Sequence, residues 1–341
     1  MEGEDTDRPV MERGLWMDLR QRTRRFSASV VLCACILRLG LAGLPALLFP
    51  IYSETGQDVR FSASLEELPW HFRESPAPWI PEAKLPEFSA EDLQRVSMDY
   101  DCALRPDLEE LLKMPLDWNL KGAEPAVLIL HTHTTESYAK GTDDYTESGS
   151  YRTLEEAHNM LSIGQTVAEI LTEAGITVIH DRQIHDYPSY NGSYVHSRSS
   201  TEKILEENPG ICLILDLHRD ALETEGKQMR TLTQVEGETA AQLMMVVGTD
   251  VSRQNHKNWK ENLALALKLH VLLERENPGI MRPVNLRSQR FNQDLSTGAL
   301  LIEVGAAGNT RKEALLTARK LAEAIVTLAG GCSIDYDSWA A

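Results

Sequence analysis

Cysteine and basic residues are both scarce in this sequence, and each shortage argues against a class of protein. The five cysteines match neither the spacing of a zinc ribbon nor that of a disulfide framework, so a metal site would need histidines and carboxylates. The 34 lysines and arginines are outnumbered by 51 aspartates and glutamates, which gives a net charge of −17. This balance argues against a nucleic acid partner, because phosphate binding requires a basic surface. The 42% of hydrophobic and 25% of charged residues are typical of a globular protein with one large or two modest domains.

A long apolar stretch, residues 26–52, predicts a membrane anchor. A transmembrane helix needs about 20 apolar residues, and Arg38 is the one charged residue here. Four arginines precede the stretch and acidic residues follow it, so the positive-inside rule places residues 1–25 in the cytoplasm. The sequence therefore predicts a single-pass protein of the cell membrane with an extracytoplasmic remainder. A cleaved signal peptide is the alternative, but no A-x-A site follows a short apolar region.

The next segment, residues 53–120, is expected to be an extracytoplasmic spacer. It contains five prolines within 18 residues and has little periodicity, and proline interrupts both helices and central strands. A catalytic domain is expected over residues 121–331, and residues 332–341 are expected to form a tail.

Within residues 121–331, short apolar runs alternate with stretches of helical periodicity. Continuous apolar runs predict buried strands at 126–130, 176–179, 211–217, 243–247 and 299–304. Helices are predicted at 155–174, 198–207, 258–276 and 310–329. This pattern predicts an α/β domain with three layers, in which a mainly parallel sheet has helices on both faces.

Three of these predicted strands end in residues that could carry chemistry. The first runs into His131-Thr132-His133-Thr134-Thr135-Glu136, the strand from 211 runs into His218, and the last contains Glu303. Parallel strands bring their carboxyl ends to one edge of a sheet, where sites form. Two histidines and a carboxylate are the ligand set of a catalytic Zn²⁺. Asp216 lies two residues before His218 and is either a ligand or an acceptor that orients an imidazole.

Two further segments are candidates for substrate binding. The segment 185–194 contains three tyrosines, of which Tyr190 and Tyr194 could stack on a sugar or hold a peptide, or simply pack on the sheet. The segment 290–296 could bind substrate carboxylates through Arg290, with Asn292 beside it, or form a polar turn.

Several long motifs in this order resemble the stage II sporulation protein P family. They are HTHTTESY (131–138), the segment 152–160, HDYPSYNGSY (185–194), LDLHRDA (215–221) and NQDLSTGALLIEVGAAGNT (292–310). The resemblance covers about residues 126–330. It implies a fold similar to that of zinc-dependent cell-wall amidases, preceded in the chain by one transmembrane helix.

The resemblance also implies an activity and partners. The family is described as membrane-anchored, zinc-dependent N-acetylmuramoyl-L-alanine amidases with endopeptidase activity toward peptidoglycan. They act in forespore engulfment together with the stage II sporulation proteins D and M. Another zinc carboxypeptidase or deacylase, and a non-catalytic wall-binding protein that recruits partners, are the alternatives.

The resemblance assigns roles to individual residues. His218 is implied as a zinc ligand and Glu303 as the catalytic carboxylate, while His131 and His133 remain alternatives for the first ligand. Glu136 fits an H-x-x-E pattern as the carboxylate ligand, and related amidases favour Glu155 or Glu156. Arg219 or Arg290 is expected to hold the peptide or stabilise developing negative charge.

Overall fold

The computed structural model describes residues 85–116, 118–120, 124–141 and 151–330. The expected anchor at 26–52 and the expected tail at 332–341 lie outside these residues. The chain divides into two units, Met1–Glu74 and Ser75–Ala341, and the following description concerns the second. Among the described helices, none combines the length and the apolar composition that crossing a bilayer requires.

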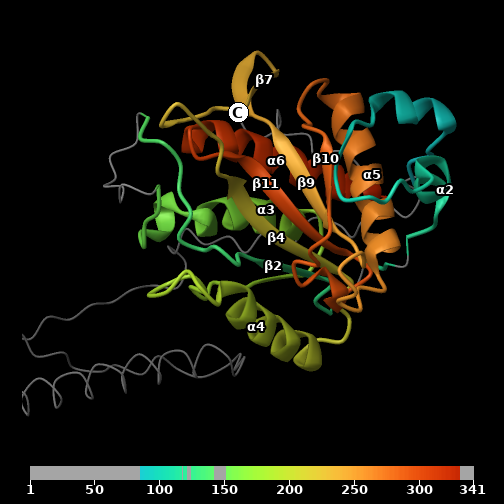
Figure 1. Ribbon diagram of the computed structural model, residues 1–341, viewed down its shortest axis with the longest axis horizontal. Coiled ribbons are helices and arrows are strands. Elements are labelled where there is room, and N and C mark those ends of the chain that lie inside the picture. The colour runs from blue at the N-terminus through green and yellow to red at the C-terminus, as the bar shows by residue number, and fades with distance from the viewer. Residues whose placement is uncertain (1–84, 117, 121–123, 142–150, 331–341) are drawn as a thin grey trace, which may run out of the picture. The chain divides into compact units, whose positions relative to one another are not determined.

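A seven-stranded sheet forms the centre of the fold, in the order β1-β10-β9-β11-β4-β2-β3 (Figure 1). Its strands are β1 (Met98–Asp101), β2 (Val127–Leu130), β3 (Val178–His180), β4 (Leu213–Asp220), β9 (Leu243–Gly248), β10 (Val284–Arg287) and β11 (Ala299–Ala306). All neighbouring strands are parallel except β9 and β11. The carboxyl ends of β2, β3, β4 and β11 therefore lie at one edge of the sheet, as the strand pattern predicted for β2, β4 and β11.

Helices cover the two faces of the sheet unequally. The helices are α2 (Leu108–Lys113), α3 (Met160–Glu173), α4 (Ser193–Glu207), α5 (Trp259–Glu276) and α6 (Arg311–Leu328), with short 3₁₀ turns η1 (Ala90–Arg95), η2 (Glu156–His158) and η3 (Gln293–Leu295). α3, α5 and α6 pack on one face, whereas α4 lies apart from them (Figure 1). Two small hairpins complete the described elements: β5 (Glu223–Thr224) with β6 (Lys227–Gln228), and β7 (Leu232–Val235) with β8 (Glu238–Ala241).

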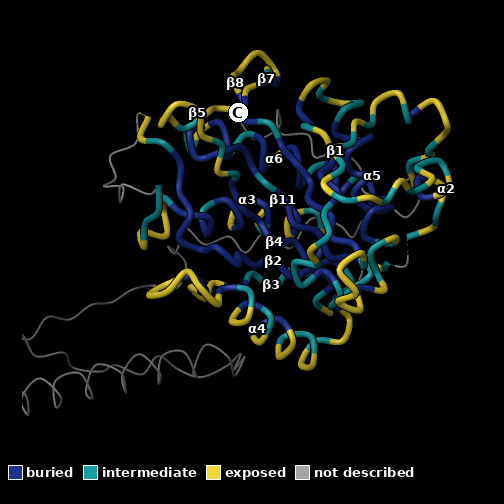
Figure 2. Tube along the Cα trace, in the orientation of Figure 1, coloured by how far each residue is buried: buried dark blue, intermediate teal, exposed yellow. Residues whose placement is uncertain are grey.

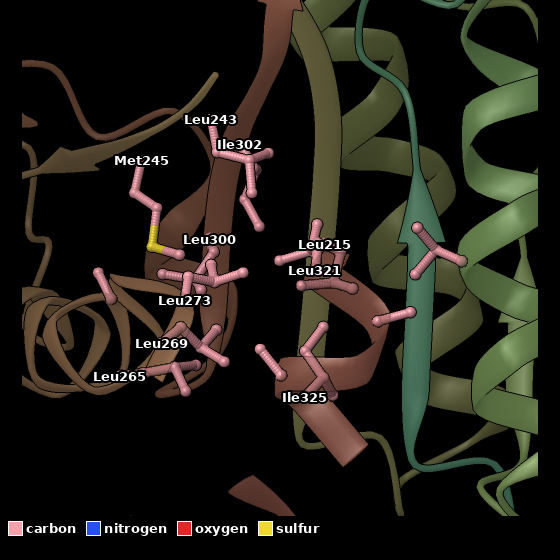
Figure 3. Packing of buried hydrophobic residues seen from close by; sticks show 14 of the residues in the cluster. Leu215, Leu243, Met245, Leu265, Leu269, Leu273, Leu300, Ile302, Leu321 and Ile325 are labelled. Carbon is pink, nitrogen blue, oxygen red and sulfur yellow. The ribbon is translucent and has the colours of Figure 1, made fainter. Parts of the chain in front are cut away.

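The main core lies between the sheet and the three packed helices. Leu273 of α5 lies close to Leu300 of β11, Leu321 of α6 lies close to Leu215 of β4, and Leu265, Leu269 and Ile325 continue the same cluster along the helices (Figure 3). Burying each such side chain contributes about 1.5–3 kcal/mol. The central strands β2, β4, β9 and β11 are buried along nearly their whole length, whereas α4 is largely exposed on its outer side (Figure 2).

The opposite face has thinner cover. Ile204 and Leu205 of α4 pack against Leu128 and Ile214 of the sheet. Over β9 and β11, Phe291 of a loop packs on Met244, Val246 and Leu301. The expectation of a mainly parallel sheet with helices is confirmed, but a loop replaces the expected helical layer over this half of the face.

The segment 85–120 differs from the expected spacer. β1 pairs in parallel with β10 at the edge of the sheet, and Leu111, Leu112 and Leu120 are buried in the main core. The prolines before residue 87 led to the prediction of a spacer over this whole region. The elements η1, β1 and α2 are too short to show a periodicity that would have indicated folded structure. The folded domain therefore includes at least residues 90–120.

Candidate functional site

Two neighbouring strands place His218 and Glu303 side by side. In the register of β4 and β11, His218 pairs with Glu303, and the pairing shifts immediately afterwards, between Glu303 and Ala306. Gly305 has φ +74°, a left-handed conformation that glycine adopts without strain. This bulge ends the regular pairing just beyond the two polar side chains, as bulges beside functional sites often do.

His133 reaches the same place from the turn that follows β2. β2 ends at Leu130, and residues 132–135 form a turn, so the alternation of a strand no longer fixes the side-chain directions. The His133 ring centroid lies 5.2 Å from that of His218, with the two rings nearly perpendicular. Its Nδ1 is buried and has no hydrogen-bond partner. Burial lowers the pKa of His133 to about 4, so its imidazole is neutral at pH 7.

His131 does not join this group. Its Nδ1 lies 3.0 Å from the carbonyl oxygen of Leu217, and its Nε2 lies 2.9 Å from Nε2 of His180. A Cβ atom at Gly164 of α3 would come within 2.7 Å of both imidazoles, so this histidine pair lies directly beneath the helix. Burial, followed by the neighbouring His180, lowers the pKa of His131 to about 3. With both nitrogens occupied, His131 is a packing residue here, and of the two alternatives His133 is the one beside His218.

Glu136 contributes a carboxylate to the group and is held by two arginines. Its Oε2 accepts the backbone N–H of Arg219 at 3.2 Å and lies 3.6 Å from Nδ1 of His218. Its Oε1 accepts a hydrogen bond from Arg152. Although burial raises the pKa of Glu136, Arg219 and His218 outweigh it and lower the pKa to about 2. Glu136 is therefore ionised at neutral pH.

The other two carboxylates that were considered lie on the surface. Glu155 caps the short η2 turn, and Glu156 forms an ion pair with Arg182 at 2.5 Å. Both are exposed. The structure therefore brings Glu136, rather than these two, to His218.

His218 is held between two carboxylates. Its Nε2 lies 2.9 Å from Oδ1 of Asp216, although the N–H direction is too poor for a hydrogen bond. Asp216 also accepts the backbone N–H and the hydroxyl of Thr132, at 2.8 and 2.7 Å, so it joins β4 to the turn that carries His133. Although burial lowers the pKa of His218, Asp216 and Glu136 raise it well above its ordinary value.

Glu303 is the group in this site with a pKa suited to proton transfer near neutral pH. Burial raises its pKa to about 8, with Glu136 and Asp220 adding to the rise and His218 opposing it. Glu303 as a whole is partly exposed, but its Oε2 atom is buried and lacks a hydrogen-bond partner. Such a carboxyl can both accept and donate a proton at neutral pH.

The donor chemistry of His133, His218 and Glu136 fits a catalytic zinc ion. Nδ1 of His218 and Oε2 of Glu136 are 3.6 Å apart. Two ligands of one tetrahedral zinc ion lie about 3.4 Å apart, given bonds of about 2.1 Å. The partnerless Nδ1 of His133 supplies a third donor. As they stand, however, no three His, Cys, Asp or Glu side chains of the described residues are grouped closely enough to hold a metal ion.

Two of the three tyrosines of the segment 185–194 contact His133. The Tyr190 ring stacks on the His133 ring with centroids 4.4 Å apart, and the Tyr194 ring meets it edge-on at 5.6 Å. Tyr194 belongs to the first turn of α4, which begins five residues earlier than predicted. Tyr190 is 53% exposed, so a bound molecule can reach it.

Arg290 and Asn292 are linked to His133 through Tyr194. Asn292 donates to the carbonyl oxygen of Tyr194 at 2.8 Å. Arg290 donates to the carbonyl oxygen of Gln254 and to Asp294. Both residues line a cavity of about 420 Å³ that Tyr194 also lines.

Arg219 is buried, and its side chain contacts backbone carbonyl oxygens and Glu136. Its side chain donates to the carbonyl oxygens of Ser137 and Tyr151, each at 3.0 Å, and lies 3.6 Å from Glu136. These contacts hold Arg219 against the segment that carries Glu136.

Sequence reasoning gave no role to Arg152 or Asp186. The Arg152 guanidinium contacts Glu136 and Asp186, and it lies 4.7 Å from the Tyr190 ring centroid. Asp186 in turn accepts the backbone N–H and the hydroxyl of Thr135. Both residues stand within the motifs quoted above, but neither has a spacing that indicates a contact with Glu136.

Comparisons with known proteins give the following similarities. The chain matches the family described as stage II sporulation protein P over residues 81–326. The stage II sporulation protein P of Bacillus subtilis (strain 168) is 30% identical over 203 residues, which cover 56% of this chain and 48% of that protein. The match thus spans about half the length of this curated relative.

Solved structures with a similar arrangement include two N-acetylmuramoyl-L-alanine amidases. The one from Nostoc punctiforme has 14% identity and a TM-score of 0.38, and the match covers 60% of this chain and 97% of that one. The one from Mycobacterium smegmatis has 13% identity and a TM-score of 0.38, with 62% and 99% covered. The family match, which confirms the resemblance seen in the motifs, covers well over half of the sequence, and the chain therefore belongs to the stage II sporulation protein P family.

Proposed function

We propose that the protein is a metal-dependent peptidoglycan hydrolase, an N-acetylmuramoyl-L-alanine amidase with endopeptidase activity. The observation that carries the proposal is the convergence of His133, Glu136 and His218 beside Glu303, from three separate segments of the chain. Membership of the family supports the same activity, through the properties that the motif resemblance implies.

His133, Glu136 and His218 would hold a zinc ion in this proposal. A zinc ion at such a set supplies Lewis acidity for the hydrolysis of an amide. Asp216 lies beside the His218 ring, and Arg219 and Arg152 hold the Glu136 carboxylate, so both donors are restrained by their neighbours.

Glu303 moves the protons in this scheme. Its carboxylate takes a proton from the attacking water and then passes it to the nitrogen of the leaving amine. A carboxyl with its pKa raised to about 8 gives up and regains a proton readily near neutral pH. Tyr190 and Tyr194 shield His133 from bulk water and provide apolar surface for the peptide or the sugar.

Product analysis on purified muropeptides tests the activity. Stem peptides released with a free N-terminal L-alanine indicate an amidase, whereas single released residues indicate a carboxypeptidase. His218→Ala and Glu303→Gln should each lower hydrolysis by several orders of magnitude while the far-UV circular dichroism stays unchanged. Hydrolysis by His218→Ala at the wild-type rate would refute the metal mechanism, and no hydrolysis by the wild type would favour a non-catalytic wall-binding protein.

A matched pair of glutamates tests the ligand assignment. Glu136→Gln should lose bound zinc, as measured by elemental analysis of the purified protein. Glu156→Gln should keep it, because Glu156 is an exposed partner of Arg182. The reverse result would assign the ligand role to Glu156 of η2.

The membrane anchor, the sporulation role and the partners belong to the same proposal. The arginines before the apolar stretch 26–52 support a cytoplasmic N-terminus and an extracytoplasmic catalytic domain, on the side where peptidoglycan lies. The family resemblance supports a role in forespore engulfment with the stage II sporulation proteins D and M. Protease added to intact protoplasts should digest the domain; protection of the domain would contradict the orientation.

A further inference from the structure

The cavity beside Tyr194 combines aromatic walls with an incompletely paired guanidinium. It has a volume of about 420 Å³, within the usual range for ligand pockets. Tyr194 and Phe291 line it, and their ring centroids lie 6.0 Å apart. The Tyr194 ring also contacts His133 edge-on, so one aromatic ring separates this cavity from the proposed reaction centre.

Two arginines line the cavity, and only one of them can accept a ligand. All three nitrogens of Arg198 already face carboxylates: it forms a bidentate pair with Asp294 at 3.0 and 3.0 Å, and its Nε pairs with Glu202 at 2.8 Å. Arg290 uses only Nη1, for the carbonyl oxygen of Gln254 and for a longer contact of 3.3 Å to Asp294. Among the described residues, its Nε and Nη2 have no hydrogen-bond partner. These two groups are the pair with which arginine binds a carboxylate in a bidentate manner.

The loop that carries Arg290 is held rigidly in an unfavourable conformation. Phe291 and Asn292 have φ of 51° and 59°, which costs non-glycine residues of order 1 kcal/mol or more each. Gln293 holds the loop to β9 through two bonds of 2.7 Å, to Gly248 N–H and to the carbonyl oxygen of Val246. Such strain persists because the surrounding contacts overdetermine it, and here it aims Phe291 and Arg290 at the cavity.

We infer that this cavity is the subsite for an acidic stem peptide, in which Arg290 pairs with the α-carboxylate of its second residue. The inference rests on the proposed function and specifies the substrate of that site. The ring centroids of His133 and Tyr194 lie 5.6 Å apart, and a peptide spans about 3.3–3.6 Å per residue, so the Tyr194 wall of the cavity lies roughly two residues of extended peptide from His133. In peptidoglycan stems the second residue is a γ-linked glutamate whose α-carboxyl is either free or amidated.

Two substrates that differ in one group test the inference with the full-length protein. They are N-acetylmuramoyl-L-alanyl-γ-D-glutamate and its α-carboxamide. The wild type should prefer the acid by about 10-fold or more in kcat/KM, the usual gain from a charge-assisted pair. Arg290→Gln should remove the preference by slowing only the acid, and Arg290→Lys should retain part of it. Arg105→Gln is the matched control, because Arg105 is exposed, does not line the cavity and, among the described residues, contacts only nearby carbonyl oxygens and the Tyr100 ring.

Calorimetry on the released dipeptides provides a readout that does not depend on catalysis. L-Alanyl-γ-D-glutamate should bind the wild type about 10-fold more tightly than its carboxamide, and Arg290→Gln should bind both equally. Binding that depends on Arg290 without hydrolysis would support the subsite and refute the amidase. Hydrolysis without preference between acid and amide, or an equal loss on both in Arg290→Gln, would refute the subsite and leave the amidase standing.

Discussion

At the scale of single residues, His131 and His133 illustrate how one histidine becomes a ligand candidate and another a packing residue. His131 continues the direction of Ile129 into the core beneath α3, where His180 and the Leu217 carbonyl oxygen occupy both of its nitrogens. His133 follows a turn and points to His218 with its Nδ1 unpartnered. The difference arises from the end of β2 at Leu130, because the alternation of side chains ceases with the strand.

A pair of alanine substitutions separates the two roles. His133→Ala should lose zinc while its unfolding midpoint without metal stays close to that of the wild type. His131→Ala should lose about 2–4 kcal/mol of unfolding free energy, because it leaves a cavity and an unpaired carbonyl, but it should keep zinc whenever folded. Chemical denaturation and elemental analysis measure the two effects. Zinc loss in His131→Ala alone would assign the ligand role to His131.

At the scale of elements, the bulge in β11 interrupts the strand just after Glu303. Gly305 follows Glu303 by two residues, and a Cβ atom there would lie 2.7 Å from Cβ of Ala241. Gly175, which ends α3, has a similar φ of +80° but nothing within 4 Å of the same position. The two glycines therefore differ in packing and not in backbone conformation.

This difference predicts unequal effects of the same substitution. Gly175→Ala should cost about 1 kcal/mol of unfolding free energy, through the left-handed backbone alone. Gly305→Ala should cost about 2–3 kcal/mol and should also lower kcat, since the clash displaces the strand that carries Glu303. Urea denaturation and muropeptide hydrolysis measure these effects. Equal costs and unchanged kcat in both variants would show that the bulge does not position Glu303.

Helix α5 contains a lysine buried without a carboxylate partner in the described structure. Lys268 donates to the carbonyl oxygen of Leu112, and its Nζ lies 4.7 Å from the Phe88 ring centroid. Burial lowers the pKa of Lys268 to about 8, against 10.5 for an unperturbed lysine. Between these two values the unfolded chain binds more protons than the folded one, so stability rises with pH. Below pH 8 the cost of the buried charge is fully present.

The comparison with Lys268→Met isolates this contribution. The unfolding free energy of the wild type should rise by about 1–2 kcal/mol relative to the variant between pH 8 and 10.5, after allowance for solvent screening of the Lys268 ammonium group. Urea denaturation across this range measures the difference. A difference that stays constant with pH would mean that Lys268 titrates normally in the folded protein.

At the scale of the whole molecule, the domain depends on residues that lie before the first catalytic motif. β1 completes one edge of the sheet, and α2 packs on α5. Removal of this segment would expose the apolar side of α5 and delete Leu111, Leu112 and Leu120 from the core. Each of these leucines contributes about 1.5–3 kcal/mol through burial, and domains are stable by only about 5–15 kcal/mol.

Two fragments with different start points test this dependence. The fragment 81–330 should unfold in one cooperative transition, whereas the fragment 121–330 should lose more than about 4 kcal/mol or fail to fold. Thermal and urea denaturation followed by circular dichroism compare them. Equal stability would restore residues 85–120 to the role of a spacer.

The sequence by itself predicted which polar residues gather at one edge of the sheet and the order of most of the elements. Apolar runs identified β2, β4, β9 and β11, because strands buried on both faces must be apolar along their length, and the residues at three strand ends identified His218, Glu136 and Glu303 as neighbours. β1 and β10 escaped notice because polar residues interrupt them, so neither forms a continuous apolar run, and α2 is only six residues long. The antiparallel pairing of β9 with β11 left no local signal. Only the tertiary structure placed His133 rather than His131 beside His218, directed Arg219 at backbone carbonyl oxygens and brought Arg152 to Glu136. These outcomes depend on where side chains point after a strand ends and on contacts between segments far apart in the chain, which local sequence patterns do not encode.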